Sequence, residues 1–208
     1  ADETLVVELH DQGGTSGVSI LRKGHRERIE AKLVVACDGV FGASRRLTGA
    51  PPLRRMLTLQ KHFRGRCPLD PAKFYAFTSP RYSGYDAWVN TKNERVIIGT
   101  AAGTLARARS DYDGFRAYLT GERGFHLEEE LSEEIWAIPA VLPKCELLYR
   151  RGRVFFAGEA AGFLNPFGEG ISLALQSSTC LAAAVLQHWG TGDLDRIERD
   201  YRAEFASA

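Results

Sequence analysis

The stretch RVFFAGEAAGFLNPFGEGISLALQSS, residues 153–178, predicts a buried strand, a glycine-rich loop and a long helix in succession. Residues 154–157 form the short apolar run that a strand inside a parallel sheet shows, and Gly158 ends it. The loop contains three residues that interrupt regular structure, namely Pro166, Gly168 and Gly170. A helix is expected over residues 171–189, and its start exposes backbone N–H groups and the positive end of the helix dipole. Such a start suits a negatively charged or electron-accepting group.

The same loop resembles the second flavin fingerprint of the FAD-dependent monooxygenase and geranylgeranyl reductase superfamily (p-hydroxybenzoate hydroxylase-like flavoproteins), G-D-A-A-x-x-x-x-P-x-x-G-x-G. The matching residues are Gly158, Ala160, Ala161, Pro166, Gly170 and, one place early, Gly168. Glu159 stands where the family usually has Asp, and in the family this acid bonds the ribityl chain of FAD. The resemblance implies that this loop, up to the helix start at Ile171, binds the pyrimidine end of the isoalloxazine.

A second match lies in residues 32–46, KLVVACDGVFGASRR, where an apolar strand precedes an Asp-Gly pair and two arginines. It resembles the D-G-x-x-S-x-x-R motif of the same superfamily. Asp38, Gly39 and Arg45 fall on the pattern, so the resemblance implies that they also contact the flavin. The serine place is occupied by glycine, and Ser44 lies two residues later. Asp-Gly after a strand is by itself an ordinary turn signal, but here the two motifs occur in the order of the family.

One family feature is missing from the chain. Family members open with a strand and a G-x-G-x-x-G turn that holds the FAD pyrophosphate. Here Gly13, Gly14 and Gly17 belong to a polar hairpin turn instead, and the chain runs from Ala1 to Ala208 without such a motif. We interpret it as a fragment that lacks the N-terminal lobe. The isolated chain is therefore expected to hold no tightly bound FAD, and unpaired edges of its parallel strands are expected to favour self-association.

The expected fold class is α/β: part of a FAD-binding Rossmann-like domain with an inserted antiparallel-sheet substrate domain. Residues 1–50 and 146–208 are assigned to the cofactor domain, and residues 51–145 to the substrate domain. Alternating or apolar patterns predict strands at residues 5–9, 18–23, 26–31, 33–37, 56–63, 74–77, 87–91, 95–100 and 134–138. Further helices are expected at residues 112–121 and from residue 193 onward.

Composition excludes several classes of function. A net charge of +1 creates no field for nucleic acid, and no apolar run has membrane-spanning length. The four cysteines, Cys37, Cys67, Cys145 and Cys180, lack C-x-x-C spacing and indicate free thiols of a reducing compartment. We therefore expect a cytoplasmic protein, with peripheral membrane association if the substrate is a lipid.

The five histidines show no ligand spacing, so no metal is expected. Two basic pairs, Arg54 with Arg55 and Arg150 with Arg151, are interpreted as solvated.

The inserted region resembles the substrate domain of the reductases, because Tyr85 and Trp88 match their Tyr-x-Trp strand with one residue inserted. These two residues are the preferred candidates for the substrate pocket. Other aromatic side chains could line an apolar pocket, although a place in the core explains each of them better: Phe63, Phe74, Tyr75, Phe77 and Trp136.

Gly162 stands where the hydroxylases of the superfamily commonly have His, so the chain resembles the reductase branch more closely. That resemblance implies an FAD oxidoreductase that reduces a C=C bond of an apolar, polyprenyl-like substrate, with NAD(P)H or another reductant as electron donor. Two alternatives stay open: a flavin-dependent monooxygenase or halogenase of an aromatic compound, and an inactive domain that binds a partner chain. No catalytic residue is assigned, since Glu169 is explained by the helix dipole.

Overall fold

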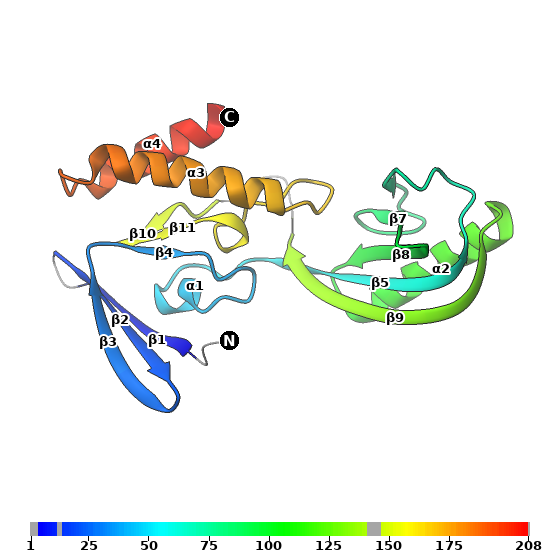
Figure 1. The fold of residues 1–208 in the computed structure, drawn as a ribbon, viewed down its shortest axis with the longest axis horizontal. Coiled ribbons are helices and arrows are strands. Elements are labelled where there is room, and N and C mark those ends of the chain that lie inside the picture. Colours follow the sequence, from blue (N-terminus) through cyan, green and yellow to red (C-terminus); the bar gives the residue numbers. More distant parts are fainter. Residues whose placement is uncertain (1–3, 12–13, 141–146, 208) are drawn as a thin grey trace. The chain divides into compact units, whose positions relative to one another are not determined.

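The chain forms two compact units, which are described separately (Figure 1). The computed structural model describes residues 4–11, 14–140 and 147–207, so Gly13 and Cys145 lie outside it. The first unit comprises Ala1–Arg54 with Val141–Ala208, and the second comprises Arg55–Ala140. The units divide after residues 54 and 140, where domain boundaries were expected after residues 50 and 145. That one unit binds a cofactor and the other a substrate stays a prediction.

The first unit opens with an antiparallel meander, as the alternating sequence pattern predicted. Its strands are β1 (Thr4–Asp11), β2 (Ser16–Arg22) and β3 (His25–Ala31), in this order across the sheet. The turn between β2 and β3 places Lys23 and Gly24 at φ values of 47° and 81°. Glycine adopts such a conformation at no steric cost, which is why the pattern breaks there.

A second three-stranded sheet brings the two motif segments together. β4 (Val34–Ala36) pairs in parallel with β11 (Val154–Phe156), and β10 (Arg150–Arg151) lies antiparallel on the other side of β11. β11 is fully buried, as its apolar run predicted. β4 is less buried than expected, with Val35 44% exposed, because β4 is the edge strand of this sheet.

Two helices, α3 (Ile171–His188) and α4 (Leu194–Ser207), pack against each other and contribute to the core of the first unit (Figure 1). α4 follows Asp193, whose Oδ1 accepts a hydrogen bond from Arg196 N at 3.0 Å, so its start is capped. Tyr201 of α4 is fully buried, and its hydroxyl donates to Phe156 O at 3.0 Å. Burial of a ring of this size stabilises the fold by about 1.5–3 kcal/mol, so α4 is anchored to β11.

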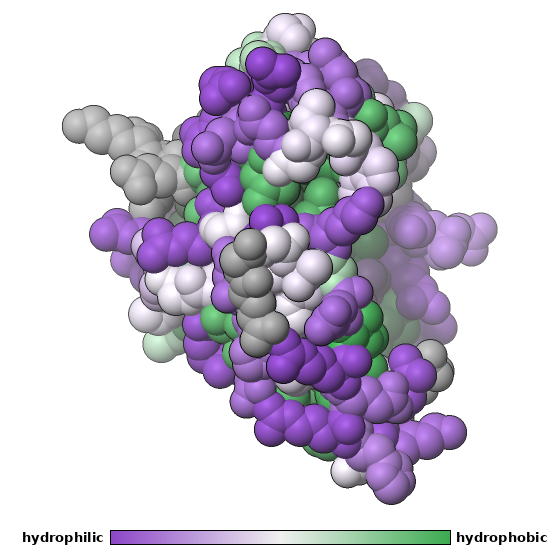
Figure 2. Space-filling model, turned by 90° about the vertical axis from the view of Figure 1, so that its left-hand side faces the viewer, coloured by the Kyte–Doolittle hydropathy of each residue, from purple (hydrophilic) through white to green (hydrophobic). Residues whose placement is uncertain are grey.

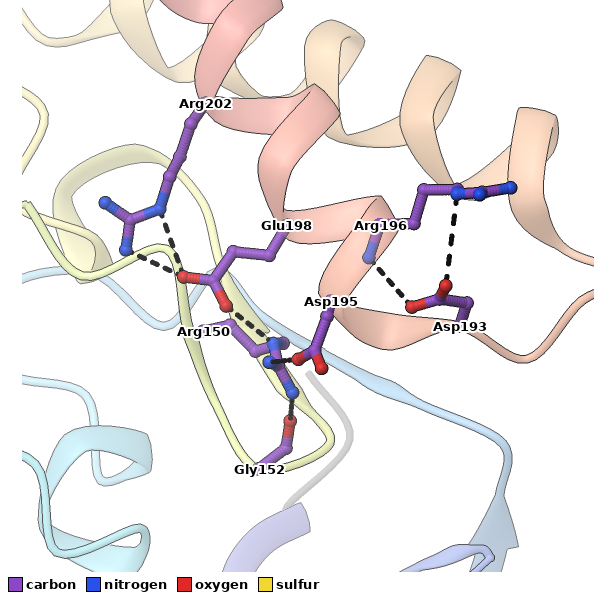
Figure 3. A network of polar contacts seen from close by, with 7 residues as sticks. All are labelled: Arg150, Gly152, Asp193, Asp195, Arg196, Glu198 and Arg202. Carbon is purple, nitrogen blue, oxygen red and sulfur yellow. Dashed lines mark hydrogen bonds and ion pairs between the residues drawn. The ribbon is translucent and has the colours of Figure 1, made fainter.

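A polar network also connects α4 to β10 (Figure 3). Arg150 Nε donates to Glu198 Oε2 at 2.8 Å, and its guanidinium also contacts Asp195. Glu198 Oε1 accepts from Arg202 Nη2 at 2.7 Å. The interpretation of Arg150 as a solvated residue is therefore wrong, because its charge is paired and its side chain is only 17% exposed. Arg151 is exposed, as expected.

The second unit is an antiparallel sheet with one helix on one face. Its strands are, in spatial order, β6 (Tyr75–Phe77), β7 (Ala87–Lys92), β8 (Arg95–Ala102), β5 (Arg55–Arg66) and β9 (His126–Pro139). The helix, α2 (Leu105–Glu122), buries Phe115 and Leu119 against Leu59 and Ile98 of the sheet. α2 begins seven residues before the expected start, because Thr104 Oγ1 accepts a hydrogen bond from Arg107 N and caps it there.

β9 is much longer than the predicted strand at residues 134–138. Its first half, HLEEELSE, carries glutamates that conceal the alternating pattern. These carboxylates pair across the sheet, for example Glu130 with Lys61 at 2.9 Å and Glu129 with Arg64 at 2.6 Å. The strand is thus held by cross-strand ion pairs and backbone pairing with β5 more than by apolar burial.

On the side drawn in Figure 2, hydrophilic residues predominate, and hydrophobic residues appear as small areas between them. No helix within the described residues is both long and apolar enough to cross a membrane.

Candidate functional site

The two motifs meet at the carboxyl ends of β4 and β11. Phe156 is in register with Ala36, and Ala157 N donates to Ala36 O at 3.1 Å. Asp38 and Glu159 therefore both lie just beyond the carboxyl ends of neighbouring parallel strands. Open α/β sheets bind ligands at this edge.

Gly158 joins β11 to a short 3-10 helix, η1 (Gly158–Ala160), and is held against α3. Its φ is +59°, and a Cβ at this position would lie 3.2 Å from Ala174 Cβ. Its N–H donates to Ser177 Oγ at 2.9 Å. The need for glycine here follows from backbone conformation and helix packing, whereas a close approach of flavin stays a prediction.

The loop before α3 is organised by Asn165. Its Oδ1 accepts hydrogen bonds from Phe167 N at 3.0 Å and Glu169 N at 2.9 Å. Within this turn Gly168 has a φ of +77°, whereas Pro166 is exposed. Glu169 Oε1 accepts from Ser172 N at 2.7 Å, so it satisfies a first-turn N–H of α3 as the helix-dipole interpretation requires.

Glu159 is the acid of this loop without a partner. Its side chain is half-buried, burial raises the pKa of its carboxyl, and no described residue forms a hydrogen bond or ion pair with it. A Cβ at Gly170 would lie 3.1 Å from Glu159 Oε1 and 3.1 Å from Leu164 Cδ1, so the carboxylate lies beside the residue that precedes α3. Ile171, the first residue of α3, is exposed. An unpaired carboxylate beside a helix start fits a ligand that donates hydroxyl hydrogen bonds, as a ribityl chain does.

Asp38 has a structural partner. Its Oδ2 accepts from Ser44 N at 2.8 Å and its Oδ1 from Ser44 Oγ at 2.6 Å. Ser44 begins the short helix α1 (Ser44–Leu47), so Asp38 stabilises the start of that helix. Gly39, in the turn between β4 and α1, has a φ of +71°, a left-handed conformation that favours glycine. Ser44 lies two residues after the serine position of the family motif. Its hydroxyl thus bonds Asp38, the acid of that same motif.

Arg45 joins the two motifs. It is buried, and its guanidinium donates to Ala160 O at 2.8 Å, Ala161 O at 3.0 Å and Pro51 O at 2.9 Å. These bonds hold the backbone after Glu159 against the segment that follows Asp38. Sequence reasoning assigned Arg45 to the flavin and did not foresee this role, because Ala160 and Ala161 lie about 115 residues further along the chain. A flavin contact of Arg45 stays a prediction.

The second unit carries a row of polar contacts on the face of its sheet opposite α2. A Cβ at Gly99 would lie 2.2 Å from Trp88 Cε2, so glycine allows the indole to lie directly on β8. Trp88 Nε1 donates to Gln60 Oε1 at 3.4 Å, and Gln60 Nε2 donates to Glu134 Oε2 at 2.7 Å. Glu134 Oε1 lies 3.4 Å from His62 Nε2. The bond from Gln60, with His62 nearby, lowers the pKa of the Glu134 carboxyl.

The predicted pocket aromatics divide between the two faces of this sheet. Trp88 and Trp136 lie on the face opposite α2, and Trp136 is 64% exposed. Phe63 and Phe77 contact the α2 core, so for these two the core interpretation applies. Tyr85 lies in the turn before β7, where its N–H donates to Ser83 Oγ at 3.1 Å.

Sequence reasoning missed Asp86. This residue is buried, burial raises the pKa of its carboxyl, and apart from its own N–H no described residue bonds it. It lies two positions before Trp88. The sequence did contain a signal, because one residue is inserted in the Tyr-x-Trp match between Tyr85 and Trp88. An acidic residue directly before a buried strand is costly to bury, so its presence there suggests a function.

Neither a family model nor a curated protein sequence matches the chain. Solved structures do. A geranylgeranyl bacteriochlorophyll reductase-like protein from Thermoplasma acidophilum shares 16% identity at a TM-score of 0.76, over 96% of this chain and 52% of the other. The flavin-dependent halogenase CmlS shares 20% identity at a TM-score of 0.71, over 99% and 40%. The anhydrotetracycline hydroxylase OxyS from Streptomyces rimosus shares 20% identity at a TM-score of 0.53, over 98% and 44%.

The chain thus spans about half, or less, of the length of these structures. Their functions differ, and what they share with this chain is its architecture. The predicted α/β fold with an antiparallel-sheet unit is confirmed, because the chain shares its fold with a reductase-like protein, a flavin-dependent halogenase and a hydroxylase.

Proposed function

We propose that the chain is the isoalloxazine-binding and substrate-binding part of a FAD-dependent oxidoreductase. The observation that carries this proposal is the unpaired, half-buried Glu159 carboxylate beside the start of α3. Glu159 would accept hydrogen bonds from the ribityl hydroxyls, and the positive end of the α3 dipole would stabilise negative charge on the ring. Bound FAD supplies the two-electron redox chemistry, and the chain's residues orient it.

A FAD titration of the full-length protein tests the role of Glu159. Glu159→Ala is expected to weaken FAD binding about ten- to a hundredfold, because charge-assisted hydrogen bonds contribute about 1.5–3 kcal/mol. Glu159→Asp, the family's usual residue, should retain most of the affinity. Glu27→Ala, on the exposed strand β3, is the matched control. Unchanged affinity in Glu159→Ala would contradict the assignment.

For the reaction we propose reduction of a C=C bond in an apolar, polyprenyl-like substrate. One carbon receives a hydride and the other a proton, and NAD(P)H or another reductant supplies the two electrons. Asp86 of the second unit, whose carboxyl has a pKa raised by burial, is the proposed donor of the proton to the substrate carbon. The reductase-like protein among the similar structures supports this choice. Asp86→Asn should lower the rate of substrate reduction without changing FAD affinity.

A second candidate is oxygenation or halogenation of an aromatic substrate. It is favoured by the polar row from Trp88 through Gln60 to Glu134, because an unfunctionalised hydrocarbon cannot bond these groups. The halogenase and the hydroxylase among the similar structures agree with it. NAD(P)H oxidation that begins only on addition of an aromatic compound, with one O₂ consumed per NAD(P)H, would decide for this candidate. Reduction of substrate under anaerobic conditions would decide against it.

A further inference from the structure

We propose that a cavity of about 290 Å³ in the first unit binds a phosphate group. Three segments form it: the β1–β2 hairpin, the end of α1 and the turn between β10 and β11. The cavity is lined by Val154, the first residue of β11, whereas the loop at residues 158–170 follows the last residue of that strand. It is therefore a site separate from the proposed flavin loop.

The cavity has an excess of positive charge from the β10–β11 turn. Arg151 and Arg153 line it, and Asp11 is the carboxylate among the lining residues. Arg153 is positioned, because its Nε lies 3.6 Å from Asp11 Oδ1 and its Nη1 donates to Lys32 O at 3.1 Å. The Arg151 side chain is exposed and forms no hydrogen bond or ion pair with any described residue. One guanidinium is thus held in place, and the other is available to a ligand.

The geometry of the turn keeps these groups close together. Gly152 separates the two arginines at a φ of +59°, and a Cβ there would lie 2.8 Å from Asp11 Oδ2. Glycine therefore permits both the left-handed turn and the approach of the carboxylate that orients Arg153. His10 also lines the cavity, but its Nε2 is directed to Glu8 Oε2 at 3.0 Å.

A buried hydroxyl in the wall lacks a partner. Ser16 is 2% exposed, and its Oγ is buried with no hydrogen-bond partner among the described residues. Burial of a hydroxyl without a partner is unfavourable, so the site is incomplete without an acceptor. Guanidinium groups bind phosphate with paired N–H donors. A phosphate oxygen would accept from Ser16 Oγ once the atoms that cover this hydroxyl shift, because it is closed to solvent in this structure. At about 290 Å³ the cavity suits a phosphate with a small substituent.

Isothermal titration of the full-length protein with inorganic phosphate tests the proposal. Phosphate should bind the wild type, and Arg151→Gln should weaken it about tenfold, as loss of a charge-assisted bond does. Ser16→Ala should weaken it severalfold. Arg199→Gln, an exposed arginine of α4, is the matched control and should bind as the wild type does. Absence of phosphate binding, or equal affinity in all three variants, would overturn the proposal.

AMP and adenosine separate the sources of the phosphate. Tighter binding of AMP than of phosphate would assign the site to a nucleotide-type phosphomonoester, and equal affinity would assign it to free phosphate. Adenosine that binds as tightly as AMP would overturn the proposal. If Arg151→Gln does not fold, as judged by circular dichroism, Arg151→Lys serves instead. It keeps the charge but loses the paired donors, so its phosphate affinity should be intermediate.

Discussion

At Gly42, the Asp38 carboxylate leaves no room for a side chain. A Cβ at Gly42 would lie 2.0 Å from Asp38 Cγ, and that carboxylate receives both bonds from Ser44. Gly42→Ala is expected to lower the free energy of unfolding by more than Asp38→Ala, which removes the two bonds from Ser44 and costs about 1–2 kcal/mol. The double variant should be no less stable than Gly42→Ala alone, because Asp38→Ala also removes the clash. Urea unfolding measures all three, and strictly additive losses would contradict this geometry.

At the scale of an element, Glu198 of α4 is expected to make the stability of the fold depend on pH. Burial opposes its ionisation, but its bonds to Arg202 and Arg150 prevail and lower the pKa of the carboxyl below 4.5. Above pH 4.5 both folded and unfolded states are ionised, and the stabilisation is complete. As the pH falls below 4.5, the unfolded state binds the proton first, so stability decreases until the folded-state pKa is passed. Glu198→Gln should be less stable at pH 7 and lose less stability on acidification. An equally steep acid limb in thermal melts of the variant would contradict the role of this carboxylate.

Some helices and strands could be predicted from the sequence, and others could not. Strands with alternating or apolar patterns, such as β2 and β11, were predictable because the pattern itself reflects burial. The first half of β9 was not, since its glutamates are held by partners on β5 that lie about 70 residues earlier. β4 and β11 were predicted as parallel strands of one domain, but their direct pairing was not, because no local pattern specifies a partner strand. The partners of Arg45 and the cavity beside Ser16 depend on distant segments and could not be predicted.

At the scale of the whole molecule, the chain contains the proposed flavin-ring site, but its sequence has no G-x-G-x-x-G turn of the kind that holds the FAD pyrophosphate. The isolated 208-residue chain is therefore expected to be purified colourless, whereas the full-length protein should carry FAD. Absorption between 350 and 500 nm, wavelengths at about which flavins absorb, measures this directly for both proteins. A yellow, FAD-saturated isolated chain would show that another segment binds the pyrophosphate.

The second unit begins and ends at the same place. Its first strand starts at Arg55 and its last strand ends at Pro139, and these two residues are paired in register across β5 and β9. An insert whose ends are neighbours can be gained, lost or exchanged without stretching the host chain. In evolutionary terms, such a junction would let a lineage replace the antiparallel sheet, which we propose binds the substrate, and keep the unit that carries the two motifs. The same exchange could be engineered by replacing residues 55–140 with the corresponding sheet unit of a protein of similar structure.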